Sequence, residues 1–374
     1  MFLFIALLCL LSSRHMKACA AQQSENDSES NGFRVVTVSR GLVFPWSVAF
    51  LPGGDFLVTE RGGRMLLLGN DGKTRVVTGL PDIHSAGQGG LLDVITDPDF
   101  KSNRTIYFSF VAKGPGGSGT EVARAVLEDA ELKNTRIIFR AKPKTPGNIH
   151  FGSRLLASPD GTLIITLGEK GRMREAQNIS NHLGSIIRIN PDGSIPQDNP
   201  FLDRKGYPAA LYTYGNRNIQ GIALHPETGI IWFHEHGPKG GDEINILMPG
   251  VNYGWPVITY GVDYSGAVIS DKTAAPGMEQ PVVYWVPSIA PSGMTIYDGT
   301  LFPKWKGNIF IGALVQRHLR RVVLRDNNVV KQEILLKNLK ERIRDVRTGP
   351  DGFLYLLTDS ANGRLLRLEP HPGQ

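Results

Sequence analysis

The chain has 374 residues, of which 41% are hydrophobic and 20% are charged, and this balance excludes an intrinsically disordered protein. Its 43 glycines and 24 prolines, with almost no long helical pattern, favour a turn-rich all-β protein of one large domain or two ordinary ones. The formal net charge is only +6 and no Lys/Arg-rich run stands out, so nucleic acid is not expected as a partner.

An apolar run, FLFIALLCLL at residues 2–11, opens the chain and is too short to span a bilayer comfortably. Ala18 and Ala20 give an A-x-A cleavage pattern, so residues 1–20 are expected to be a secretory signal peptide, although no Lys or Arg precedes the run. Lipidation at Cys19 is the alternative to simple cleavage. The only two cysteines lie in this leader, so the mature chain would contain no disulfide and no transmembrane segment.

Residues 21–32 are polar and are expected to form a disordered lead-in. Beyond them a turn signal of the type Pro-x-Gly, or close to it, recurs six times, each copy between two short apolar strands. In most copies a third strand follows. The turn prolines, spaced 46 to 77 residues apart, are Pro52, Pro98, Pro159, Pro226, Pro303 and Pro350.

This repetition predicts a six-bladed β-propeller with four-stranded antiparallel blades over residues 33–370. A pair of β-sandwiches is the alternative, but sandwiches rarely repeat one unit six times. The segment 33–42, FRVVTVSRGL, would then pair with the last blade and close the ring, which leaves no long open edge.

In a propeller the first strand of each blade lines the central channel, so the residues just ahead of the six first strands should converge at one mouth. Two of these six sets are cationic, one carries a histidine, and the others are polar or aromatic. The converging residues are Trp46, Gln88, His150, Arg217, Asn218, Ser288, Ser292, Arg342 and Arg344.

Arg342 and Arg344 are two residues apart on a strand, so their side chains share a face and are expected to point into this mouth. Surface pairing with Asp345 and Asp351 is the alternative. Several guanidiniums around one cavity repel each other unless an anion lies among them, and arginine suits bidentate binding of carboxylates. The residues therefore indicate a pocket for a multiply anionic ligand. His150 could also be a satisfied core histidine, but its place after a loop favours the mouth.

A second group of polar residues occupies 234–266, where Gly/Pro turns expose carbonyls among scattered carboxylates. Hard oxygen ligands of this kind suit calcium, and an ordinary acidic loop is the alternative. His234 and His236 share a strand face, but no third nitrogen or sulfur ligand is evident, so zinc is not favoured.

Several separated motifs together resemble one family. They include HFGSRLLASPDG, YGNRNIQGIALHP, EHGPKGGDEIN, NYGWPVITYG, PSIAPSGM and RIRDVRTGPDG. In this order they are similar to the soluble aldose sugar dehydrogenases that use pyrroloquinoline quinone (PQQ), relatives of soluble quinoprotein glucose dehydrogenase. The likeness covers about residues 33–370 and implies a six-bladed propeller.

The resemblance also implies roles for individual residues. PQQ is planar and carries three carboxylates, which the family's paired arginines hold at positions matching Arg342 and Arg344. His150 matches the catalytic histidine, and Arg217 with Asn218 matches the pair over the cofactor. The remaining matches are Gln88 at the pocket entrance, Gly237 and Pro238 for the calcium at the cofactor, and Glu243, Tyr253 and Asp263 for a second, structural calcium.

Three positions depart from the family pattern. Val315 stands where better-known relatives have a lysine that grips PQQ, so one cation is missing unless Gln316 or Arg317 replaces it. Asn216 stands where histidine is common. The stretch Gly-Glu-Lys at 168–170 replaces a usual Gly-Asp-Arg and keeps the charges.

The expected activity is PQQ- and calcium-dependent oxidation of the anomeric carbon of an aldose to a lactone. His150 would take the proton, Arg217 would stabilise the oxyanion, and electrons would pass to an external acceptor. A calcium-binding propeller lactonase or a sugar-binding module is the rival, and neither needs an anion clamp. The leader and the family together imply a periplasmic or secreted enzyme.

Overall fold

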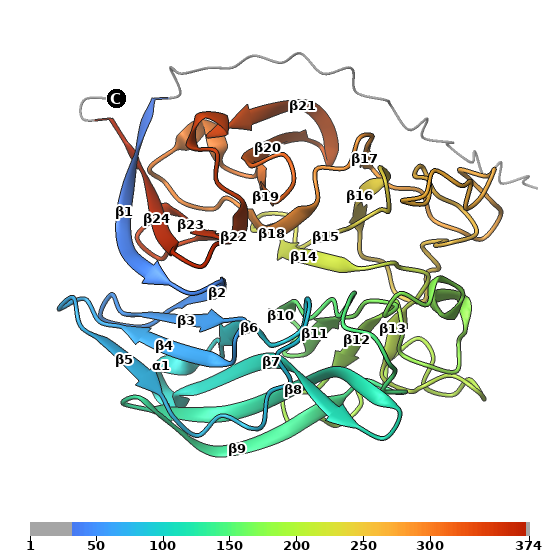
Figure 1. Cartoon of the computed structure of the whole chain (residues 1–374), viewed down its shortest axis with the longest axis horizontal. Coiled ribbons are helices and arrows are strands. Elements are labelled where there is room, and N and C mark those ends of the chain that lie inside the picture. Colours follow the sequence, from blue (N-terminus) through green and yellow to red (C-terminus); the bar gives the residue numbers. More distant parts are fainter. Residues whose placement is uncertain (1–31, 372–374) are drawn as a thin grey trace, which may run out of the picture.

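The computed structural model describes residues 32–371, so the predicted signal peptide and most of the predicted lead-in lie outside the described residues. Within this range six four-stranded antiparallel sheets surround a central axis, as predicted (Figure 1). In chain order the strands of the first three sheets are β2 (Pro45–Phe50), β3 (Phe56–Glu60), β4 (Arg64–Leu68), β5 (Thr74–Val77); β6 (Leu91–Thr96), β7 (Thr105–Gly114), β8 (Gly117–Glu128), β9 (Glu131–Arg140); and β10 (Leu155–Ala157), β11 (Leu163–Thr166), β12 (Ile186–Ile189), β13 (Leu211–Thr213).

The other three sheets repeat this meander. Their strands are β14 (Ile219–Leu224), β15 (Ile231–Glu235), β16 (Asp242–Ile246), β17 (Val283–Trp285); β18 (Pro291–Ile296), β19 (Ile309–Ala313), β20 (His318–Arg325), β21 (Asn328–Leu335); and β22 (Ile343–Thr348), β23 (Leu354–Thr358), β24 (Gly363–Pro370), β1 (Phe33–Leu42). The described helices are short: α1 (Phe100–Asn103) and the 3-10 turns Met173–Gln177, Pro303–Trp305 and Lys337–Leu339. No helix between residues 32 and 371 has the length and apolar character needed to cross a bilayer.

Each of the six turn prolines lies between the first and second strand of its blade. The signal is local, because Pro and Gly supply the backbone angles that a tight reversal needs between two strands whose apolar side chains become buried. This explains why the blade count was readable from the sequence.

The N-terminal strand β1 forms the outer strand of the last blade, as the sequence predicted (Figure 1). It pairs antiparallel with β24, with Phe33 opposite Pro370 and Leu42 opposite Gly363. The two ends of the described chain are therefore joined by a β-ladder, and the ring has no gap between its first and last blades.

The hydrophobic core is divided among the six interfaces between neighbouring blades. Leu57 and Met65 of the first blade pack in one buried cluster with Phe108 of the second. Ile164 of the third blade likewise shares a cluster with Phe233 of the fourth. Because each sheet buries both faces against its neighbours, strands such as β11 are buried at every position rather than at alternate ones.

Four charged side chains, three of them buried and the fourth, Arg347, partly buried, join the blades near the axis. Arg154, which precedes β10, forms ion pairs with Asp345 (2.8 Å) and Asp93 (3.5 Å). Arg347 forms ion pairs with the same two carboxylates, at 2.7 Å from Asp93 and 3.0 Å from Asp345. Ser47 of the first blade donates to Asp93 at 2.6 Å. Two carboxylates and two guanidiniums balance, so this cluster, which we call the axial charge cluster, holds four blades together without a net charge.

Candidate active site

A cavity of about 250 Å³ opens at one end of the axis, above the axial charge cluster. Arg154 of that cluster stacks under the indole of Trp46 at 4.0 Å and donates to the carbonyl of Gln220, and both of these residues line the cavity. All six blades contribute to the wall, from the starts of their innermost strands. The lining includes Trp46, Arg61, Gln88, Phe151, Asn218, His236, Ala290, Val315, Arg342 and Arg344.

Arg342 and Arg344 lie side by side in this cavity, and both donate to one oxygen of Asp359, each at 3.1 Å. The alternative partners are engaged elsewhere, Asp345 in the axial charge cluster and Asp351 by the hydroxyl of Tyr355. Burial alone would raise the pKa of Asp359, but the two guanidiniums outweigh it and hold that pKa below its usual value. The single carboxylate of Asp359 thus balances only one of the two guanidinium charges, so this part of the site carries a net positive charge.

Two further observations fit an anionic ligand. Arg61 lines the same cavity and adds a third guanidinium, which sequence reasoning missed because its neighbours in the chain, Glu60 and Gly62, give no hint of it. The Nε–H of Arg344 is buried and has no acceptor among the described residues. A planar polycarboxylate would supply acceptors for such donors, so the residues present fit PQQ.

Val315 is an apolar residue in the wall of the cavity, at the position where the family resemblance implies a lysine. Val315 lines the cavity as expected, whereas neither Gln316 nor Arg317 is part of its wall. Arg61, which precedes Val315 by more than 250 positions in the chain, contributes a guanidinium to the same wall.

His150 immediately precedes the lining residues Phe151 and Gly152 and is only 8% exposed. Its amide donates to Gln88 Oε1 (2.8 Å), and its Nδ1 lies 3.0 Å from Glu169 Oε2. Glu169 is also held by the amides of Gly171 and Arg172. Because an ionised carboxylate can only accept, Nδ1 carries the proton and Nε2 keeps its lone pair.

The backbone at His150 is left-handed, with φ +52°. Gly168 permits this close approach, because a Cβ there would lie 2.4 Å from the carbonyl oxygen of His150. The sequence identified Glu169 only as a charge-preserving departure. Its role as the partner of His150 needed the contact between two loops, which no local pattern reports.

Arg217 and Asn218 serve different partners. The buried guanidinium of Arg217 donates to the carbonyls of Gly237 (2.9 Å) and His236 (3.2 Å), and the side chain of Asn218 accepts from the amide of Gly152 (3.1 Å). Asn218 lines the cavity, and Arg217 contacts its rim from behind His236. The amide of Gly237 is in turn fixed by Asp242 at 2.9 Å.

The imidazole of His236 is buried close to Arg217 and Arg344. Burial is the main cause that lowers its pKa to about 3, and the nearby positive charges of Arg217 and Arg344 contribute to this shift. His236 is therefore neutral, and both it and His234 hydrogen-bond to blade-five carbonyls rather than to a metal. Ser292 and Ser288 are likewise structural, bound to Ile343 and Asp242.

The residues predicted for a second calcium are not drawn together by any contact among the described residues. The hydroxyl of Tyr253 donates to the carbonyl of Ile246, and Asp263 accepts from Ser265. Burial raises the pKa of Glu243 well above its usual value, and the nearby Glu235 adds to this rise. Residues 32–371 hold no group of three His, Cys, Asp or Glu side chains arranged for a metal, so this calcium stays a prediction.

Comparison with known proteins gives a consistent result. Residues 42–367 match the family described as Glucose / Sorbosone dehydrogenase. The chain is 40% identical to the aldose sugar dehydrogenase YliI of Escherichia coli, over 99% of this chain and 98% of that protein. A crystal structure of a glucose dehydrogenase superposes with a TM-score of 0.88 at 45% identity, covering 89% of this chain and 99% of the other. The PQQ-bound aldose sugar dehydrogenase of Streptomyces coelicolor gives a TM-score of 0.74 at 27% identity, covering 90% and 98%.

Proposed function

This chain belongs to the glucose/sorbosone dehydrogenase family, and from that premise we propose that it oxidises the anomeric carbon of aldose sugars to lactones with PQQ and calcium. One observation carries the proposal. Arg61, Arg342 and Arg344 face a single carboxylate in a cavity that adjoins a carboxylate-oriented histidine. A propeller lactonase or a sugar-binding module has no use for such an excess of guanidinium groups.

The arginines bind and orient the cofactor's carboxylates. When bound, PQQ supplies the hydride acceptor and calcium supplies a Lewis acid beside it. Gln88, whose side chain holds the His150 amide, fixes the base against that site. Gly237 and Pro238 would offer their carbonyls to the calcium. The Gly237 carbonyl already accepts from the guanidinium of Arg217, and its second lone pair would be available to the metal.

His150 removes the proton of the anomeric hydroxyl through Nε2, since Nδ1 is committed to Glu169. The carboxylate of Glu169 stabilises the imidazolium that forms and keeps the ring in one tautomer. The guanidinium of Arg217 would stabilise negative charge on the reacting oxygen. Electrons then leave for an external acceptor. The leader expected at residues 1–20 would place this reaction in the periplasm or outside the cell.

The direct test mixes the purified protein with PQQ, calcium and an aldose and follows reduction of the cofactor by its absorption spectrum. The Arg342→Ala/Arg344→Ala variant should raise the Kd for PQQ at least about a hundredfold, since each lost charged hydrogen bond costs about 1.5–3 kcal/mol. Arg364→Ala in the same blade removes only an ion pair with Glu341 and is the matched control. Unchanged PQQ affinity in the double variant, or lactone hydrolysis without cofactor reduction, would favour the rival lactonase.

The Glu169→Gln variant tests the orientation of the base. We expect kcat to fall about 10- to 100-fold. The reason is that a neutral amide can present either its oxygen or its NH2 group to Nδ1, so it no longer fixes one tautomer or stabilises the imidazolium that forms. Glu227→Gln, at an exposed surface pair with Lys306, is the control. A kcat equal to that of the Glu227→Gln control would contradict the role of Glu169 in orienting His150.

A further inference from the structure

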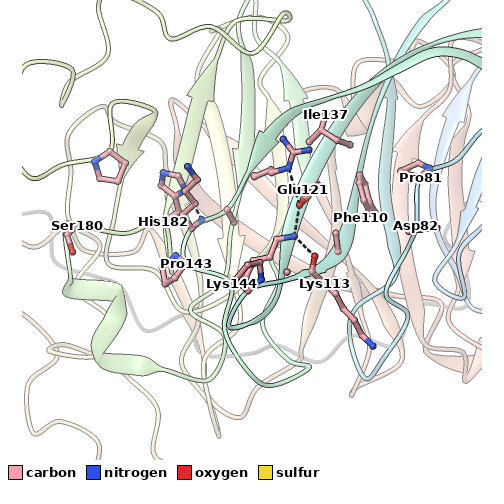
Figure 2. Close-up of a pocket in the computed structure, with 17 residues that line it drawn as sticks. Pro81, Asp82, Phe110, Lys113, Glu121, Ile137, Pro143, Lys144, Ser180 and His182 are labelled. Atoms are coloured by element: carbon pink, nitrogen blue, oxygen red, sulfur yellow. Dashed lines mark hydrogen bonds and ion pairs between the residues drawn. The ribbon is translucent and has the colours of Figure 1, made fainter.

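A second cavity, of about 950 Å³, lies between the second and third blades and shares no lining residue with the axial cavity. Figure 2 shows His182 and Pro143 on one side of it, Phe110 and Lys113 on the other, and the side chains of Lys144 and Glu121 between them. Its volume is within the range that holds an organic ligand of moderate size. No step of the proposed reaction uses this cavity.

The interior of this cavity is mainly apolar. Phe110 and Ala112 of β7 and Ile137 of β9 form part of its wall, with Ala141 beside them. Pro81, Pro143 and Pro208 complete the apolar lining. Such a surface gains free energy by burying a ring or an aliphatic body in place of water.

The charges around the cavity are predominantly positive. Glu121 is buried and satisfied, with Lys144 at 2.5 Å and Arg140 at 3.4 Å. Lys113 and Lys142 are exposed lining residues and have no acidic partner within ion-pair distance among residues 32–371. The lining holds four cations and only two acids, the second of which is the exposed Asp82, so an anionic group would be attracted here.

His182 adds a directed hydrogen-bond donor. The residue is 8% exposed, its ring lies against Phe139, and its Nδ1 accepts from the amide of Lys142 at 3.1 Å. Burial and the charge of Lys142 lower its pKa to about 4, so the ring is neutral at pH 7 and Nε2 carries the hydrogen. Nε2 has no hydrogen-bond partner among the described residues, and the ring lines the cavity. Nε2–H is therefore free to donate to an acceptor atom of a ligand that occupies the cavity.

We propose that this cavity is a second small-molecule site, for an organic acid that carries an apolar ring system. The ring packs against Phe110 and Ile137, the acid group lies near Lys113 and Lys142, and an acceptor atom of the ligand meets His182 Nε2–H. The geometry of these residues carries the assignment, and it stands whether or not the chain binds PQQ.

The probe is 8-anilinonaphthalene-1-sulfonate, titrated by fluorescence at pH 7 and low salt against the full folded protein. Lys113→Glu/Lys142→Glu should raise its Kd about tenfold, as expected for two lost ion pairs with reversed charge. Lys73→Glu/Lys101→Glu changes the net charge by the same amount on other parts of the first two blades and should leave the Kd unchanged. Equal weakening by both pairs, or none by either, would overturn the proposal.

Two further measurements distinguish the contributions of the apolar wall and of the His182 donor to probe binding from the contribution of charge. Ile137→Trp narrows the apolar part of the cavity without changing charge and should weaken binding of both this probe and its uncharged analogue, N-phenyl-1-naphthylamine. The Kd of the uncharged analogue should be the same for Lys113→Glu/Lys142→Glu as for the unchanged protein. His182→Phe should weaken the sulfonate probe several-fold. Sugar oxidation should be unaffected in every one of these variants, and a probe that still binds Ile137→Trp normally lies elsewhere.

Discussion

Replacing His150 with alanine should lower kcat for aldose oxidation by about a thousandfold or more, while PQQ continues to bind. The reason is that a positioned general base contributes about 10²- to 10⁴-fold to rate, and Nε2 of His150 is the lone pair that Glu169 leaves free. The measurement is single-turnover reduction of bound PQQ by the sugar, which isolates the chemical step from reoxidation.

Two controls protect this test. His150→Asn keeps a side chain that tolerates the left-handed backbone at φ +52°, so loss of turnover there cannot be assigned to misfolding. His225→Ala removes an imidazole that only caps a surface turn and should retain turnover. Added imidazole should partly restore the alanine variant. Near-normal reduction by both His150 variants would refute the base assignment.

The second large effect is on stability. Arg154→Met should lower the free energy of unfolding by about 3–5 kcal/mol, because removing one partner of a buried charge group leaves an uncompensated carboxylate. In the axial charge cluster, Arg347 alone would then face both Asp93 and Asp345. A lower urea midpoint at an unchanged slope is the expected observation.

The matched substitution is Arg34→Met, which breaks an exposed pair with Glu369 and should cost at most about 1 kcal/mol. The double variant Arg154→Met/Asp345→Asn restores charge balance and should recover part of the loss. If Arg154→Met unfolds no earlier than Arg34→Met, the axial charge cluster does not hold the blades together.

The fold was predictable because its signals are local and repeated. Each Pro-x-Gly turn joins strands that are neighbours in the chain, so Pro52 or Pro350 marks its blade without knowledge of any other. The placing of β1 against β24 was also predicted, because a ring built from a meander must be closed by its ends.

The site was predictable only in part. Arg342 and Arg344 could be identified because two residues on one strand share a face, and the mouth follows from propeller geometry. Two other residues could not be identified in this way. Asp359 meets the two arginines from the next strand region, and Arg61 lines the cavity from another blade, so tertiary packing rather than sequence spacing places both. Glu169 was visible as a charge, but its hydrogen bond to His150 joins residues nineteen positions apart in loops.

The ladder between β1 and β24 also determines when the sixth sheet can form during synthesis of the chain. The segment Phe33–Leu42 is synthesised first among the described strands, yet its partner Gly363–Pro370 emerges last. Until then the sixth sheet lacks its outer strand, and a ten-residue strand at the head of the chain has no ladder to join. A chain that stopped before Gly363 would keep every cavity residue named above and would still lack the strand that closes the ring.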